Sequence, residues 1–144
     1  MPNVKFGVTA KSGNSTKTEV VARGFKITID EPENLGGTNA GANPVEYVLA
    51  ALSGCLNVVG HLIAKEMGFK LNSLEIALEG DLDPAKFTGK SANGRAGYNE
   101  IRVTMKPDTD ADKATLEKWL KAVENRCPVS DNISNPTPLH ITLG

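Results

Sequence analysis

The sequence is poor in cysteine and histidine, with two of each among 144 residues. So few cysteines exclude a small scaffold held together by disulfides, and a chain of this length buries roughly two thirds of its unfolded surface without such bonds. The four side chains also lack the close pair spacing of a zinc site. We therefore expect no metal and no cofactor.

An excess of charge of either sign is also missing, because 16 basic and 17 acidic residues give a net charge of −1. This balance provides no electrostatic footprint for nucleic acid or for an anionic membrane surface, so neither is an expected partner. The first residues, Met1 to Phe6, contain no apolar stretch flanked by basic residues that would indicate export. The expected location is the cytoplasm, where thiols are kept reduced and a disulfide is transient rather than structural.

Several nucleophile and nucleotide motifs are absent as well. Ser53 is not framed by G-x-S-x-G, and the glycines at 36, 37 and 41 precede a helix without the lysine of a phosphate loop. The chain has no internal repeat. Its length and the absence of repeats predict a single domain over residues 1–144.

Apolar periodicity predicts an α+β fold in the order βββ-α-ββ-α-β. Period-two alternation indicates half-buried strands, and the glycine-rich segment 31–43 reads as a long loop. Thr109 with Asp112 three residues later resembles a capping box, so we expect the second helix to begin there and to end near Arg126. The expected strands are 4–8, 18–23, 25–29, 74–82, 101–105 and 139–143, and the expected helices are 44–67 and 109–126.

The first of these helices is long and apolar on more than one face. Asn43 suits the cap and Pro44 the first helical position, and the apolar run then continues to Met67. A membrane span is disfavoured because polar residues, among them Glu46 and His61, interrupt the run. A helix that is apolar all round needs partners on several sides, so we expect a second subunit to cover part of it.

The two cysteines lie in different local settings. Cys127 precedes Pro128, so it is a candidate for the cap of a short helical turn, where unpaired amides stabilise a thiolate. Cys55 follows Gly54 inside the long helix, where the missing side chain admits another backbone or a small substrate. Each cysteine alone fits either a small buried apolar residue or a reactive thiol.

Two motifs in this order bear on these alternatives. The first is Asn43-Pro44-x-Glu46-x-x-Leu49-Ala50-Ala51-Leu52-x-Gly54-Cys55, and the second is Arg126-Cys127-Pro128-Val129-Ser130. Together they resemble the OsmC/Ohr family of thiol-dependent peroxidases and their relatives. The likeness extends to Asp30-Glu31-Pro32 with Gly36-Gly37 and to Gly97-Tyr98-x-x-Ile101, so it covers nearly the whole chain.

The resemblance implies a fold, a partner and a reaction. The fold would be OsmC-like, with two antiparallel sheets around long central helices in an intertwined homodimer. Cys55 would attack an organic hydroperoxide, or hydrogen peroxide, and become a sulfenic acid. Cys127 would resolve it as a disulfide that a dithiol reductant opens, in defence against oxidative stress.

Two positions depart from the reductase pattern. The activating carboxylate is expected ten residues before the first cysteine, where this chain has Val45, and Glu46 lies about 180° from Cys55 around the helix. Glu46 therefore fits a catalytic role or a favourable first-turn acid. For the arginine that would hold the thiolate, Arg23 is the best candidate, followed by Arg126 and Arg102, and each also fits an ordinary surface residue. These departures are the reason for an alternative to the peroxidase function. In it the chain is a non-peroxidatic OsmC-like redox sensor or a protein that binds a small apolar ligand.

Overall fold

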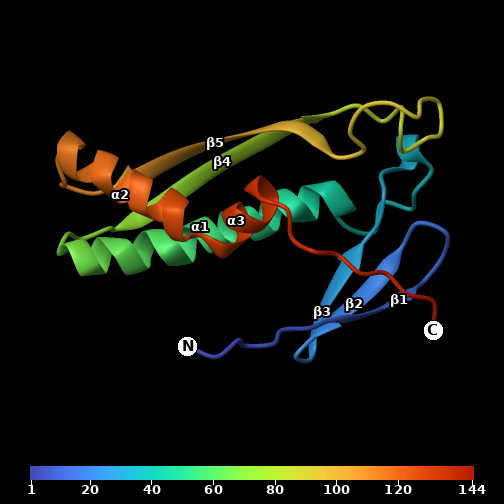
Figure 1. Ribbon diagram of the computed structural model, residues 1–144, viewed down its shortest axis with the longest axis horizontal. Helices are drawn as coiled ribbons and strands as arrows, with labels where there is room; N and C mark the ends of the chain where they lie inside the picture. The colour runs from blue at the N-terminus through green and yellow to red at the C-terminus, as the bar shows by residue number, and fades with distance from the viewer. The chain divides into compact units, whose positions relative to one another are not determined.

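Two antiparallel sheets and three α-helices make up the chain, which confirms the α+β fold class (Figure 1). The computed structural model describes all residues from 1 to 144. They form two units, 1–50 and 51–144, and the boundary falls within the long helix. The elements are β1 (Thr9–Ser12), β2 (Thr18–Ala22), β3 (Phe25–Ile29), a 3-10 turn (Glu33–Leu35), α1 (Pro44–Met67), β4 (Ser73–Leu82), β5 (Tyr98–Asp108), α2 (Lys113–Arg126) and α3 (Pro128–Ser134).

The first unit is built on a three-stranded sheet in the order β1-β2-β3. Val20 of β2 pairs with Ala10 on one side and with Ile27 on the other. The β2–β3 turn is Arg23-Gly24, with φ of 50° and 86°. Positive φ at both central residues is what a two-residue hairpin turn needs to match the strand twist.

The loop that follows β3 is organised by Asp30, whose side chain is fully buried. Its carboxylate accepts hydrogen bonds from the backbone N–H groups of Glu31 at 2.7 Å and of Ala40 at 3.1 Å, and from the hydroxyl of Thr38. These bonds hold the pKa of Asp30 well below its usual range, with the Thr38 bond as the largest cause. The buried Asp30 carboxylate thus holds this loop together on both sides of the 3-10 turn.

The start of α1 is capped as the sequence predicts. The side chain of Asn43 accepts from the N–H of Glu46 at 2.9 Å, and the Glu46 carboxylate accepts from the N–H of Asn43 at 2.8 Å. This is a reciprocal capping box. The hydroxyl of Tyr47 donates to the carbonyl of Thr28 at 2.9 Å and so ties the first turn of α1 to β3.

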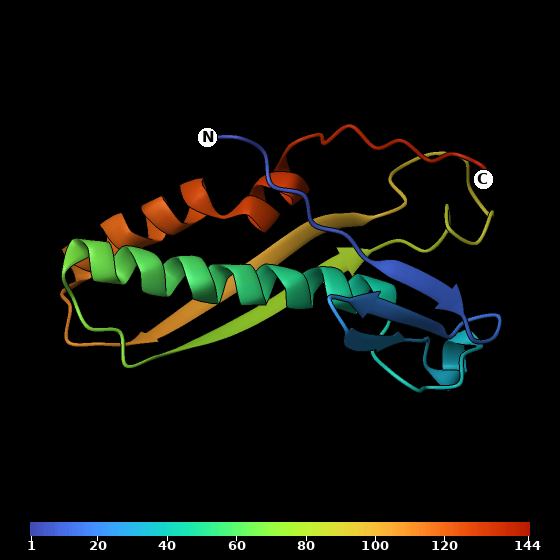
Figure 2. The ribbon, with the colours of Figure 1, turned by 90° about the horizontal axis from the view of Figure 1, so that it is seen from below.

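The second unit packs a long hairpin and a second helix around α1 (Figures 1 and 2). β4 and β5 pair from Ser73↔Asp108 to Leu82↔Tyr98, which confirms the predicted hairpin. β4 alternates regularly between half-buried and exposed side chains, as a strand with one face on a core must. The core consists of Leu52, Leu56, Val59, Ile63, Ala64, Trp119, Val123 and Cys127.

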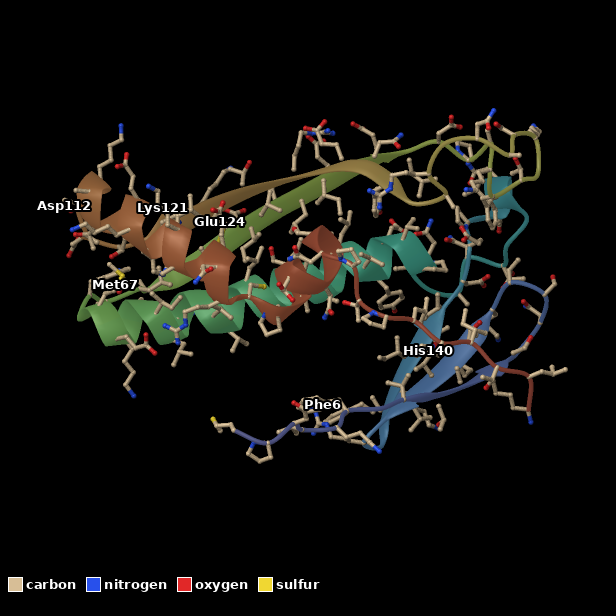
Figure 3. The ribbon with its side chains drawn as sticks, in the orientation of Figure 1. Phe6, Met67, Asp112, Lys121, Glu124 and His140 are labelled. Atoms are coloured by element: carbon tan, nitrogen blue, oxygen red, sulfur yellow. The ribbon has the colours of Figure 1, made fainter.

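Both predicted terminal strands are wrong for the chain by itself. Residues 4–8 and 139–143 have no regular structure, and the first strand begins instead at Thr9. Phe6 and Ile141 are each 86% exposed, so neither alternating segment has an apolar surface to lie on. The last element of regular structure is therefore a helix, α3, and the order is βββ-α-ββ-α-α. Figure 3 marks Phe6 and His140 on these two irregular segments.

The predicted capping box of the second helix is also wrong. Asp112 caps α2 through the N–H of Thr115 at 2.8 Å, and the helix begins at Lys113. The hydroxyl of Thr109 donates to the carbonyl of Lys70 at 2.6 Å, so it is engaged before the helix starts. Thr115 stands where a capping box needs Glu or Gln, which is why Asp112 acts alone.

By length and composition, α1 could cross a membrane. Core helices of soluble proteins meet the same criterion. Buried residues on α1 include Leu52, Leu56 and Ile63, which pack with α2 in the hydrophobic core.

Candidate active site

Cys55 and Cys127 lie side by side in the second unit. Their sulfurs are 3.1 Å apart, within hydrogen-bonding distance, although 72 residues separate them in the sequence. Both are free thiols; Cys127 is buried and Cys55 is half-buried. Two thiols this close need only a small movement to form a disulfide.

Cys127 occupies the junction between α2 and α3. It follows the last residue of α2 and caps α3, where its sulfur accepts from the N–H of Ser130 at 3.4 Å. Pro128 takes the first helical position, as the sequence predicts. An extended backbone at Cys127, with φ of −81° and ψ of 113°, breaks the helix and turns this sulfur toward α1.

The surroundings of Cys55 favour its neutral form. Burial raises the pKa of the Cys55 thiol, and the neighbouring Cys127 sulfur raises it further because two adjacent thiols resist both carrying a negative charge. The backbone N–H of Val129 acts in the opposite direction and lowers it. The Val129 amide thus stabilises a Cys55 thiolate, but burial has the larger effect on the pKa of Cys55, which stays raised.

An apolar groove of about 380 Å³ lies in the same unit. It is bounded by α1, β5 and α2, and its α1 wall is formed by Leu52 and Leu56, on either side of Cys55 in the sequence. Ser130, whose amide binds the Cys127 sulfur, also lines it. The groove therefore offers an apolar ligand a place beside the turns that carry both thiols.

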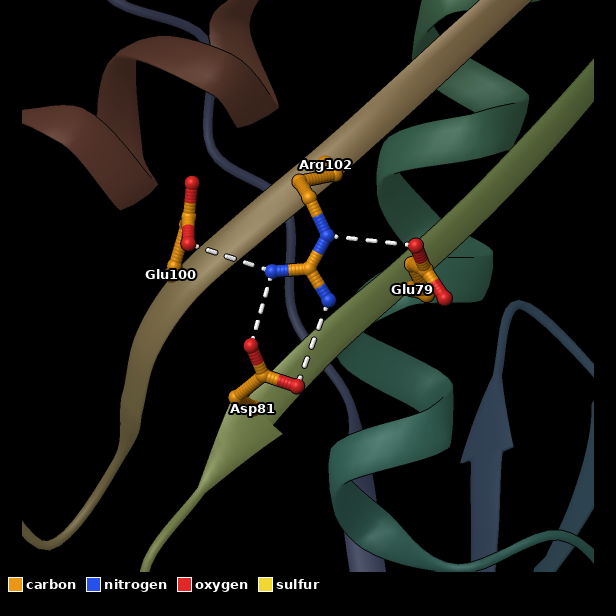
Figure 4. A network of polar contacts seen from close by, with 4 residues as sticks. All are labelled: Glu79, Asp81, Glu100 and Arg102. Atoms are coloured by element: carbon orange, nitrogen blue, oxygen red, sulfur yellow. Dashed lines mark hydrogen bonds and ion pairs between the residues drawn. The ribbon is translucent and has the colours of Figure 1, made fainter.

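Arg102 is engaged on the outer face of the β4–β5 hairpin. Its guanidinium binds Glu79 at 3.1 Å, Asp81 at 2.7 Å and Glu100 at 3.1 Å (Figure 4). Ile101, the preceding residue on β5, packs against the core, so strand alternation puts Arg102 on the opposite face. Arg102 is thus held in a carboxylate cluster.

Arg126 is engaged as well, although it directly precedes Cys127. Its guanidinium binds both carboxylate oxygens of Glu66 in α1, at 2.6 Å and 3.0 Å. This bidentate pair lowers the pKa of Glu66 and raises that of Arg126. Within residues 51–144, neither Arg102 nor Arg126 is among the groups that shift the pKa of Cys55.

The remaining two predicted residues, Arg23 and Glu46, belong to the first unit, residues 1–50. Arg23 is exposed in the β2–β3 turn, with its guanidinium carbon 5.2 Å from the centre of the Phe25 ring. Glu46 is exposed, and its carboxylate closes the capping box with Asn43.

Sequence reasoning missed the amide of Val129 and the contacts of Trp119. Pro128 indicates free amides in the first turn of α3, but it does not show that one of them serves Cys55 rather than Cys127. The indole N–H of Trp119 donates to the carbonyl of Gly60 at 2.8 Å, a contact that no motif in either segment signals.

Comparison with known proteins adds a family to this geometry. The sequence matches the family model described as OsmC-like protein over residues 37–142, a span that includes both cysteines. No curated protein matches the chain.

Solved structures share the fold at low sequence identity. The OsmC-like protein of Mycoplasma pneumoniae is similar with a TM-score of 0.80 and 20% identity, covering 92% of this chain and 89% of that one. An organic hydroperoxide resistance protein OsmC of Legionella pneumophila gives 0.63 and 18%, covering 92% and 91%. The organic hydroperoxide resistance protein OhrB of Bacillus subtilis gives 0.58 and 21%, covering 89% of each chain. At these identities the similarity shows the fold alone.

Proposed function

The chain belongs to the OsmC-like protein family, and on this premise we propose that it is a thiol-dependent peroxidase that reduces organic hydroperoxides. The observation that carries the proposal is the 3.1 Å separation of the Cys55 and Cys127 sulfurs, contributed by different elements. Similar structures from Legionella pneumophila and Bacillus subtilis bear the name of organic hydroperoxide resistance proteins, which supports this substrate class.

The proposed cycle uses each thiol once. The Cys55 thiolate attacks the O–O bond of the hydroperoxide, taking one oxygen as a sulfenic acid, while the other oxygen takes a proton and leaves as the alcohol. The thiolate of Cys127 then attacks the sulfenic sulfur, the S–O bond breaks, and hydroxide leaves and is protonated to water. A dithiol reductant exchanges with the disulfide and restores both thiols.

The asymmetry of the two sites supports this division of roles. Cys55 is half-buried and the next residue on α1, Leu56, lines the groove, so Cys55 is the thiol that a substrate in the groove would approach. Cys127 is 1% exposed, which suits a thiol that reacts with a neighbouring sulfur and not with a solvent-borne peroxide.

We further propose a homodimer of single OsmC-like domains, each spanning residues 1–144, in the cytoplasm. The dimer is supported by apolar side chains that α1 leaves exposed, among them Val58 and Leu62. Free adjacent thiols suit a reducing compartment.

Turnover with three peroxides tests the enzymatic proposal. Purified protein with dithiothreitol should consume cumene hydroperoxide and tert-butyl hydroperoxide faster than hydrogen peroxide, since the groove is apolar. Cys55→Ser should abolish consumption and Cys127→Ser should slow it. If none of the three peroxides gives Cys55-dependent consumption, the chain is not a peroxidase.

Arg23 and Glu46 enter the proposal from the family resemblance alone. Arg23→Gln and Glu46→Gln should each lower turnover if the side chain activates the thiolate. Glu46→Gln is informative because glutamine still closes a capping box with Asn43, so the start of α1 is kept. A variant with wild-type turnover removes that residue from the site.

A second candidate function is the binding of a small apolar ligand without turnover, or redox sensing by the same thiols. It is favoured by the apolar groove and by the raised pKa of Cys55, which leaves little thiolate at neutral pH. An apolar fluorescent probe should then bind the wild type. Leu120→Arg places a charge in the groove wall at a position that is 39% exposed, and it should weaken that binding while peroxide consumption is absent in both proteins.

A further inference from the structure

The spacing of the two thiols depends on how closely α2 packs on α1. Cys55 is carried by α1, whereas Cys127 follows directly on the last residue of α2. A buried hydrogen bond joins the two helices, from the indole N–H of Trp119 to the carbonyl of Gly60 at 2.8 Å. Gly60 comes five residues after Cys55, about 1.4 turns at 3.6 residues per turn, and Trp119 comes eight residues before Cys127.

The indole fits a closely bounded space. A Cβ atom at position 60 would lie 3.1 Å from the Trp119 ring and 3.1 Å from a methyl group of Leu74, so glycine permits the approach. The ring of Phe69 meets the indole edge-on, with centroids 6.4 Å apart and planes at 76°. Trp119 itself is 2% exposed. Contacts on both sides of the Trp119 indole thus fix how closely α2 packs on α1.

A second polar link between the helices is the Arg126–Glu66 ion pair. Both of its side chains are more than two-fifths exposed, and exposed ion pairs contribute little to stability. The buried indole bond is therefore the stronger constraint, because a buried acceptor that loses its donor is not compensated by water.

We propose that Trp119 is a positioning residue for the dithiol, which sets the effective concentration of the Cys127 thiol at Cys55. The inference builds on the proposed function but concerns only the thiol pair. Disulfide formation requires Cβ atoms within about 4.5 Å, and a looser helix pair populates this geometry less often. Trp119 also lines the apolar groove, but its positioning role acts through the two cysteines and needs no substrate in the groove.

The test is the equilibrium of the thiol pair with glutathione. The protein dithiol gives two electrons and two protons to glutathione disulfide, forming the Cys55–Cys127 disulfide and two molecules of glutathione. Trp119→Phe keeps an aromatic ring and removes the N–H donor. We expect it to lower the equilibrium constant for disulfide formation about fivefold, which is about 20 mV for a two-electron couple.

Val20→Ala is the matched control, because Val20 is a buried apolar residue in the first unit. It should destabilise the protein and leave the glutathione equilibrium within twofold of wild type. An equilibrium constant for Trp119→Phe equal to that of wild type overturns the proposal. So does an equal shift in Val20→Ala, since general destabilisation would then explain both.

A second measurement needs no variant and decides the matter if Trp119→Phe does not fold. Coupling between two sites is reciprocal, so a disulfide that the indole bond favours must in turn favour the indole bond. Hydrogen exchange of the Trp119 indole N–H, followed by NMR, should be slower in the oxidised than in the reduced protein. Equal exchange rates in the two states contradict the proposal.

These results are separable from the peroxidase proposal. No peroxide is present in either measurement, so a chain without peroxidase activity can still show the Trp119 effect. Conversely, if the protein is a peroxidase and Trp119→Phe leaves its glutathione equilibrium unchanged, the proposed activity stands and only the positioning role of Trp119 is overturned.

Discussion

The acidity of Cys55 is set by its immediate surroundings. Burial is the largest cause of the raised pKa of Cys55, and the Cys127 sulfur adds to it, while the Val129 amide lowers it. Because its pKa is raised, the Cys55 thiol keeps its proton up to a higher pH in the folded protein. The reactive thiolate therefore forms only at that higher pH. Any group that activates Cys55 must therefore overcome both burial and its own neighbour.

Cys127→Ala should lower the pKa of Cys55. The substitution removes a neighbouring sulfur that raises the pKa and keeps the N–H of Val129, which lowers it. The ultraviolet absorbance of the thiolate, followed against pH, gives the value for the single remaining thiol. It should lie below the higher of the two apparent pKa values of wild type, which belong to the coupled pair. A value equal to or above that one contradicts this interpretation of the site.

At the scale of the elements, α1 carries two glycines with opposite surroundings. A Cβ atom at Gly54 would have nothing within 4 Å, whereas one at Gly60 would press on Trp119 and Leu74. The helical backbone is otherwise the same at both positions, so the pair isolates packing from helix propensity.

Gly60→Ala should lower the free energy of unfolding by about 1–3 kcal/mol, the usual cost of overpacking a core. Gly54→Ala should leave it unchanged or raise it by up to about 1 kcal/mol, because alanine is the better helix former. Urea unfolding measures both. A loss in Gly54→Ala as large as that in Gly60→Ala would show that another surface packs against Gly54.

Local signals predicted the starts of α1 and α3 well, and the start of α2 and the terminal strands badly. Asn43-Pro44 and Cys127-Pro128 define caps through residues next to each other, so the sequence was sufficient. The alternation of apolar and polar residues at 4–8 and 139–143 indicates only that one face of a strand should be buried. It does not indicate which surface buries that face. In this chain both segments remain uncovered.

The site shows the same limit. The capping role of Cys127 follows from its neighbours, but its contact with Cys55 crosses 72 residues and came from the family resemblance. The engagement of Arg102 depends on the β4–β5 register, in which Glu79 stands directly opposite Arg102. Sequence spacing does not supply that register, because the turn between the strands is a long irregular loop.

For the whole molecule, the main question is what covers its exposed apolar residues. Val58 is 65% exposed and Leu62 48% exposed on α1, within the most hydrophobic helix of the chain. The irregular segments around Phe6 and Ile141 are more exposed still. A second copy of the chain would cover such surfaces, as the proposed homodimer requires.

Light scattering after gel filtration should therefore give the mass of two chains for the wild type. Val58→Glu should shift the mass toward one chain, because a charge on the exposed face of α1 opposes burial of that face. Lys121→Glu changes the charge twice as much on an exposed position of α2 (Figure 3) and should leave the dimer intact. A wild-type mass of one chain at micromolar concentration contradicts the dimer.

The central claim is that Cys55 and Cys127 act together on a hydroperoxide, and a single turnover tests it most directly. Reduced protein is mixed with one equivalent of cumene hydroperoxide without reductant, and its free thiols and disulfide-linked peptides are then measured. We predict the loss of two thiols per chain, a Cys55–Cys127 disulfide within one chain, and one cumyl alcohol formed. Retention of both thiols with the peroxide intact, or the same peroxide loss in Cys55→Ser, would contradict the claim.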